Sequence, residues 1–128
     1  MKKRLYTLAT LALLPLLLFA QPRLQLESAD GFLKEGRRLF NQNDYQAAET
    51  YLEKWQDLTK QQNGTEARDE EVEYMLLVID AEADLSAAAG AVSEYMMRYP
   101  RSIYTNRLNS LMAASYYAQG EFENAVMW

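Results

Sequence analysis

The 128-residue chain contains neither cysteine nor histidine. It therefore has no disulfides, no thiolate or imidazole metal ligands, and no serine–histidine or cysteine–histidine catalytic pair. Glycine and proline are scarce, with five and three residues, whereas alanine, leucine and glutamate are frequent. This composition favours helices, and the length allows one domain at most, so we expect a single all-α domain.

Basic residues are fewer than acidic ones, so the formal net charge is -5 and the sequence pI is near 4.8. An acidic chain is repelled by phosphate backbones, so we expect no nucleic-acid partner. Acidic residues gather at 69–73 and 80–84, but clustered charges on helices are usually a solvated face. No glycine-rich phosphate loop and no EF-hand spacing is present. We therefore expect no enzymatic activity, no cofactor and no metal.

The first twenty residues have the order of a secretory signal peptide. Three basic residues at positions 2–4 precede an apolar stretch over 5–19, and the small Ala20 follows. The apolar stretch is too short for a comfortable membrane span. We expect cleavage after Ala20 and export of residues 21–128 to the periplasm, where association with the outer membrane stays open. An uncleaved membrane anchor is the alternative.

Apolar spacing and turn residues predict helices along the rest of the chain. A first helix is expected over 24–40, and Asp44 is the expected cap of a second helix that Gly64 ends. Thr65 is the expected cap of the third helix, which carries six apolar or aromatic residues in a row over 74–79. Such a run covers the whole circumference of a helix, so we expect this helix to have neighbours on more than one side.

The second half of the chain is expected to hold three more helices. A fourth helix restarts after Asp84, and Gly90 within it is expected to permit a close approach between helices. Pro100 ends that helix, and Ser102 is the expected cap of a fifth. Gly120 ends the fifth helix, and a sixth begins at 122.

Short patterns recur along the chain at nearly constant intervals. Ala48, Ala88 and Ala125 each lie three residues after a large apolar or aromatic residue, which itself follows an acidic one. The alanines are 40 and 37 residues apart. A small alanine lets the second helix of a pair approach the first, while larger neighbours fill the space around the contact. An ordinary helical bundle with accidental alanine spacing is the alternative.

This pattern resembles the tetratricopeptide repeat (TPR). The first unit offers Phe32, Gly36, Leu39, Ala48 and Leu52. The second offers Val72, Met75, Ile79, Ala88, Val92 and Pro100. The third offers Met112, Ala113, Tyr116, Tyr117, Gly120 and Ala125. The long units and the "YPRSIY" link are similar to the TPR regions of bacterial envelope proteins, such as outer-membrane assembly lipoproteins and the Tol-Pal coordinator.

The resemblance implies antiparallel helix pairs stacked as a short right-handed solenoid. Its units span about 24–62, 66–100 and 102–128, of which the last is incomplete. Because the last three residues are apolar, we expect the sequence to be the amino-terminal piece of a longer protein. A short gene product with a partner over this end is the alternative.

The resemblance also implies a non-enzymatic scaffold for protein–protein interaction in the cell envelope, with a concave groove that receives a protein or peptide. Arg37 and Arg107 are expected to bind carboxylates of that partner. The full set of expected groove residues comprises Leu33, Arg37, Asn41, Glu73, Leu77, Arg107, Ser110, Ala114 and Tyr117. Two alternatives remain: a glycan-binding helical-repeat protein, and a sensing or docking module of a longer envelope protein. The oligomeric state stays open.

Overall fold

The computed structural model describes residues 28–65 and 68–128, and all regular structure in these ranges is helical. The expected signal peptide over 1–20 lies outside the described residues. The helices in chain order are α2 (Ala29–Asn41), α3 (Tyr45–Asn63), α4 (Glu70–Ala83), the short 3-10 helix η1 (Leu85–Ala87), α5 (Ala88–Arg98), α6 (Thr105–Ala118) and α7 (Phe122–Val126). The prediction of an all-α fold is confirmed.

Several predicted helix ends are confirmed, and the backbone geometry explains them. The Asp44 carboxylate accepts a hydrogen bond from the Ala47 amide at 3.4 Å and caps α3. Gly64 and Gly120 follow α3 and α6 with φ values of 72° and 79°, where a side chain would be strained. Tyr99, the residue before the proline, ends α5 in a non-helical conformation.

Three predicted helix starts were wrong. α2 begins at Ala29 rather than near residue 24, because the Ser28 hydroxyl accepts from the Gly31 amide and caps the helix there. Asp69, not Thr65, caps α4 by accepting from the Val72 amide at 3.0 Å. Ser102 does not cap α6. Its hydroxyl accepts from the Tyr104 amide within a turn that precedes the helix.

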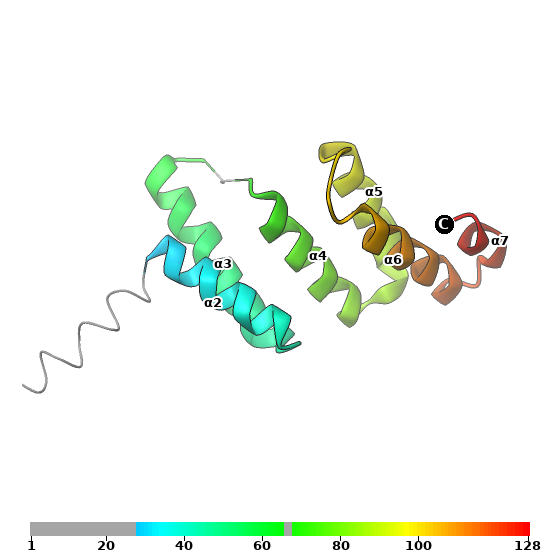
Figure 1. The fold of residues 1–128 in the computed structure, drawn as a ribbon, viewed down its shortest axis with the longest axis horizontal. Helices are drawn as coiled ribbons and strands as arrows, with labels where there is room; N and C mark the ends of the chain where they lie inside the picture. The colour runs from blue at the N-terminus through cyan, green and yellow to red at the C-terminus, as the bar shows by residue number, and fades with distance from the viewer. Residues whose placement is uncertain (1–27, 66–67) are drawn as a thin grey trace, which may run out of the picture.

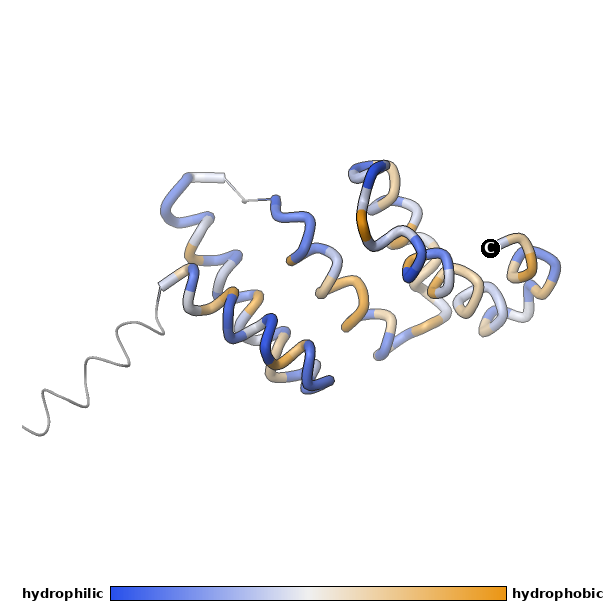
Figure 2. Tube along the Cα trace, in the orientation of Figure 1, coloured by the Kyte–Doolittle hydropathy of each residue, from blue (hydrophilic) through white to orange (hydrophobic). Residues whose placement is uncertain are grey.

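The molecule is elongated, with the α2–α3 pair at one end and α7 at the other (Figure 1). Most helices contact their neighbours in sequence, and α2 also contacts α4. The apolar positions of α4 lie near the middle of the molecule (Figure 2), where the helix packs against α2, α3, α5 and η1. The expectation that this helix has neighbours on more than one side is confirmed.

A close approach between two helices occurs at Gly36 rather than at Gly90. A Cβ atom on Gly36 would lie 2.8 Å from a methyl carbon of Leu52, so α2 and α3 pack closely because this position has no side chain. Leu52 is fully buried at this contact, and Ala48, one turn earlier in α3, is fully buried as well. Gly90 is exposed, and a Cβ atom there would meet nothing within 4 Å. The role predicted for Gly90 was therefore wrong.

Candidate functional site

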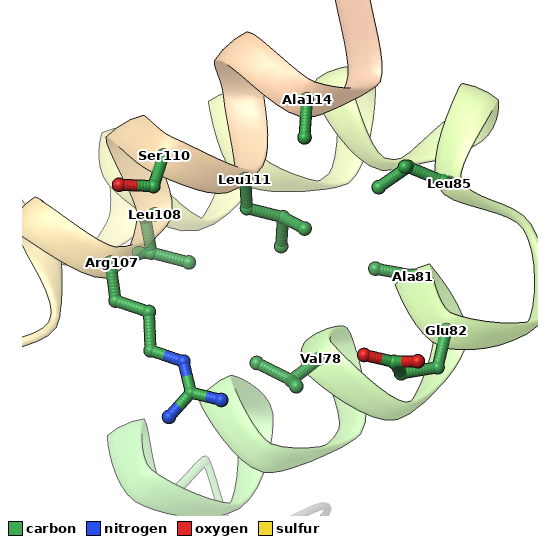
Figure 3. A pocket seen from close by; sticks show the side chains of 9 residues that line it. All are labelled: Val78, Ala81, Glu82, Leu85, Arg107, Leu108, Ser110, Leu111 and Ala114. Atoms are coloured by element: carbon green, nitrogen blue, oxygen red, sulfur yellow. The ribbon is translucent and has the colours of Figure 1, made fainter. Parts of the chain in front are cut away.

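Two hollows lie along the side of the molecule that α2, α4 and α6 form. The first, which we call the α4–α6 hollow, has a volume of about 360 Å³ and is mostly apolar (Figure 3). Its lining consists of Val78, Ala81, Glu82, Leu85, Arg107, Leu108, Ser110, Leu111 and Ala114. The second, the α2–α4 hollow, has a volume of about 320 Å³. Its lining consists of Arg37, Phe40, Asn41, Glu71, Tyr74, Met75, Tyr104 and Arg107.

The α4–α6 hollow exists because the two helices do not touch through their backbones. No Cα atom of α4 lies within 8 Å of a Cα atom of α6. Near the start of α6, the gap is bridged by the rings of Tyr74 and Tyr104, which stack with centroids 3.8 Å apart. The helix η1 contacts both α4 and α6 and places Leu85 at the opposite rim. The small side chains of Ala81 and Ala114 leave the space between these two bridges open.

The stacked tyrosines belong to a cluster of rings that joins three parts of the chain. Phe40 of α2 packs edge-on against Tyr74 of α4 at 6.1 Å and tilts against Tyr45 of α3 at 5.5 Å. Burial raises the pKa of Tyr74 and Tyr104 above the ordinary tyrosine value of 10.0, so both phenols are neutral at physiological pH. The wall between the hollows is therefore aromatic and uncharged, apart from Arg107.

Arg37 is already engaged within the protein. Its guanidinium donates two hydrogen bonds to the carboxylate of Glu71, at 2.5 and 2.8 Å, and so links α2 to α4. This is the two-pronged geometry that arginine forms with a carboxylate. A partner's carboxylate would therefore have to displace Glu71, and the binding of such a group by Arg37 stays a prediction.

Arg107 lines both hollows and is the cation between them. Its guanidinium lies 6.0 Å from the centre of the Tyr74 ring, a cation–π contact. Arg37, Arg38 and Arg98 each form an ion pair with a glutamate, whereas Arg107 forms none with any described residue. Among the arginines in the helices of residues 28–65 and 68–128, Arg107 is therefore the one that has no carboxylate partner.

The structure brings most of the predicted groove residues to these two hollows. Arg107, Ser110 and Ala114 line the α4–α6 hollow, and Arg37 and Asn41 line the α2–α4 hollow.

The other four predicted groove residues lie elsewhere. Glu73 and Leu77 are on the opposite side of α4, where Glu73 accepts a hydrogen bond from Arg98 of α5 at 2.8 Å and Leu77 is buried. Leu33 packs against the hydrophobic core. Tyr117 is 68% exposed outside both hollows, and its ring packs edge-on against Phe122.

Sequence reasoning missed the residues that shape the hollows from the α4 side. Glu71, Tyr74, Val78 and Glu82 follow one another at three- and four-residue spacing, which is the signature of one helix face. That spacing could have identified the face, but the continuous apolar run in α4 gave no sign of which side borders a hollow. Leu85 was missed because it stands on η1, a 3-10 turn that apolar periodicity does not reveal.

The residues that line these hollows can contact a ligand in several ways. They offer aliphatic and aromatic surface, one uncompensated cation at Arg107, and the carboxylate of Glu82. No group of three or more acidic side chains in residues 28–65 and 68–128 is arranged to hold a metal ion. Within these same ranges, no helix is both long and apolar enough to span a membrane.

Comparison with protein-family models, with curated proteins and with solved structures found no match to this chain.

Proposed function

We propose that the protein is a non-enzymatic scaffold that binds a protein or peptide partner along the side formed by α2, α4 and α6. The observation that carries this proposal is the pair of adjoining hollows with Arg107 between them. Together they offer an apolar surface with a few polar groups, which is the usual character of a recognition site.

The packing of the helices supports a TPR-like solenoid as the architecture of this scaffold. Ala48 and Ala88, two of the three repeating alanines, are almost completely buried, as the repeat requires. Most helix contacts join neighbours in sequence, as in a stacked repeat but also in an ordinary bundle, and the contact between α2 and α4 joins the first helices of two of the proposed units. In this proposal α2, α4 and α6 are the first helices of three successive units, and they form the binding side.

The cellular setting belongs to the same proposal. The order of basic, apolar and small residues over 1–20 supports export to the periplasm with cleavage after Ala20. The amino-terminal sequence of the protein isolated from the cell envelope tests this. A chain that starts at Gln21 supports cleavage, and a retained residue 1 in the membrane fraction supports the anchor.

Photo-crosslinking in living cells tests the binding side. A photoreactive amino acid replaces Ser110, which is exposed and lines the α4–α6 hollow, or Ser93, which is exposed on α5 outside both hollows. We expect a protein adduct from position 110 and none from position 93. Adding Leu111→Glu, which places a charge in the apolar hollow, is expected to remove the adduct. Equal crosslinking from both positions would contradict the proposal.

The glycan-binding alternative receives less support. Tryptophan rings commonly supply the flat apolar faces on which sugars stack, but Trp55 is 7% exposed and Trp128 lies outside both hollows. Neither tryptophan therefore offers its ring to a ligand at the candidate site.

A further inference from the structure

The α4–α6 hollow carries opposite charges at two places on its edge. Arg107 extends beside Val78 on one side, and Glu82 lies on the other side of the same valine (Figure 3). Neither side chain forms an ion pair with a described residue, and the two do not pair with each other. Two other glutamates of α4 are engaged, because Glu71 binds Arg37 and Glu73 binds Arg98. The uncompensated charges of α4 and α6 at this site therefore flank an apolar depression.

The helix termini strengthen this polarity. Arg107 lies in the first turn of α6, where the helix dipole adds positive potential. Glu82 lies in the last turn of α4, which contains no basic residue and where the dipole adds negative potential. The hollow thus has a positive end and a negative end, each produced by a side chain and a helix terminus of the same sign.

The centre of the hollow suits an aliphatic side chain. Leu108, Leu111 and Val78 line it, and Ala81 and Ala114 give it depth. Its volume of about 360 Å³ is near the lower end of the roughly 300–1,000 Å³ found for ligand sites. It therefore fits one or two side chains of an extended segment better than a folded element.

We propose that the α4–α6 hollow recognises a partner segment in which an aliphatic residue is flanked by an acidic residue, placed at Arg107, and a basic residue, placed at Glu82. This inference rests on the proposed function and adds the chemistry of the partner and the direction in which it lies. The apolar contact supplies most of the affinity, and the two charges fix the orientation.

A random peptide library displayed on phage tests the inference directly, because it makes no assumption about the natural partner. The library is selected on the wild-type protein, on the charge-swapped variant R107E/E82K and on the control variant R101E/E123K. Arg101 and Glu123 are exposed, form no ion pair with a described residue and lie outside both hollows. Both variants keep the net charge of the wild type, and circular dichroism checks that they stay helical.

Peptides enriched on the wild-type protein are expected to share the order acidic, aliphatic, basic. The charge-swapped variant is expected to select the opposite order, and the control variant the same order as the wild type. In solution, a peptide made from the wild-type consensus is expected to bind about tenfold more tightly than its charge-reversed counterpart. The comparison of two peptides on the unaltered protein keeps the test valid even if a variant misfolds.

The experiment distinguishes a failure of this inference from a failure of the proposed function. Enriched peptides without a common charge order, or with an order that the charge swap leaves unchanged, would overturn this inference and leave the proposed function standing. The variant Ala114→Leu fills the hollow, and Ala118→Leu, at an exposed site on the same helix, is its control. If the wild-type protein enriches no more peptide than Ala114→Leu does, the proposed function fails as well.

Discussion

Ser115 shows how a single buried hydroxyl joins two helices. The first turn of α5 has no capping side chain of its own. The Ser115 hydroxyl of α6 instead accepts a hydrogen bond from the Ala89 amide at 3.0 Å and donates to the Ser86 carbonyl at 3.2 Å. The side-chain amide of Gln119 donates to the same carbonyl at 2.8 Å. A residue distant in sequence thus supplies the cap that a local serine or aspartate usually provides.

Replacing Ser115 with alanine is expected to lower the free energy of unfolding by about 1–3 kcal/mol. The change leaves the buried Ala89 amide without an acceptor, and burying an unsatisfied donor costs this much. Urea denaturation followed by circular dichroism measures the effect. Ser93→Ala, at an exposed position of α5, is the control and is expected to shift the midpoint little. Equal effects of the two changes would show that the cap contributes nothing.

Tyr95 is expected to make the protein sensitive to alkali. Its side chain is 2% exposed, and burial raises its pKa from 10.0 to about 12. Because the folded pKa is raised, its contribution to stability is complete below pH 10 and is lost as the pH rises through about 12. We expect Tyr95→Phe to lose less unfolding free energy between these pH values than the wild type does.

Urea denaturation at several alkaline pH values measures this difference. The phenol also hydrogen-bonds Ser102 at 3.1 Å, so Tyr95→Phe is expected to be about 1 kcal/mol less stable than the wild type at pH 7. Tyr117→Phe, at an exposed ring, serves as the control. Identical pH profiles for Tyr95→Phe and the wild type would contradict the assignment.

At the scale of the elements, the α2–α3 pair depends on a glycine at its contact. Gly36→Ala is expected to destabilise the protein by about 1 kcal/mol, because the new methyl group meets the fully buried Leu52, and overpacking outweighs the gain in helix propensity. Gly90→Ala, with open space around it, is expected to stabilise the protein by up to about 1 kcal/mol. Thermal unfolding of the two variants compares them, and two changes of the same sign would refute this account.

The ion pair between Arg37 and Glu71 connects α2 with α4. The hydrogen bond from Arg37 lowers the pKa of Glu71 below 4.5, so the stabilisation is present above that pH and is lost as the pH falls through the lowered value. Because both side chains are partly exposed, Glu71→Gln is expected to cost only about 0.5 kcal/mol at pH 7.

Urea denaturation from pH 7 to pH 2 checks this prediction. The difference between Glu71→Gln and the wild type is expected to disappear at the acid end. Glu53→Gln is the control, since Glu53 is exposed and forms no ion pair with a described residue. A difference that persists unchanged at pH 2 would mean that the pair is not its source.

The sequence predicts which segments are helical and which face of each helix is buried better than it predicts which residues of two helices meet. Ala48, Leu52 and Trp55, the buried apolar residues of α3, lie four and three residues apart, and such a face can be read from the sequence because an apolar period of 3.6 depends on one helix alone. The cap of α5 and the roles of Gly36 and Gly90 could not be predicted, since each depends on what a second helix places nearby. The candidate site shows the same restriction, because the ion pair of Arg37 with Glu71 joins residues 34 positions apart and could not be predicted from helix periodicity.

At the scale of the whole molecule, a stack of helices that contact mainly their neighbours predicts that a destabilising mutation loosens the helices beside it and leaves distant helices stable. The α2–α3 pair contacts the rest of the described chain mainly through α4, and α6 reaches α4 only through side chains, such as the contact between Arg107 and the Tyr74 ring. A stack of this kind transmits a loss of stability only through adjacent interfaces. We expect Gly36→Ala to accelerate amide hydrogen exchange in α2 and α3 and to leave α6 nearly unchanged. Exchange followed by mass spectrometry at neutral pH measures each helix separately, with Gly90→Ala as the control for changes on α5. Equal acceleration in every helix would mean that the molecule opens as one cooperative unit, and it would count against the stacked-repeat architecture on which the proposed binding side depends.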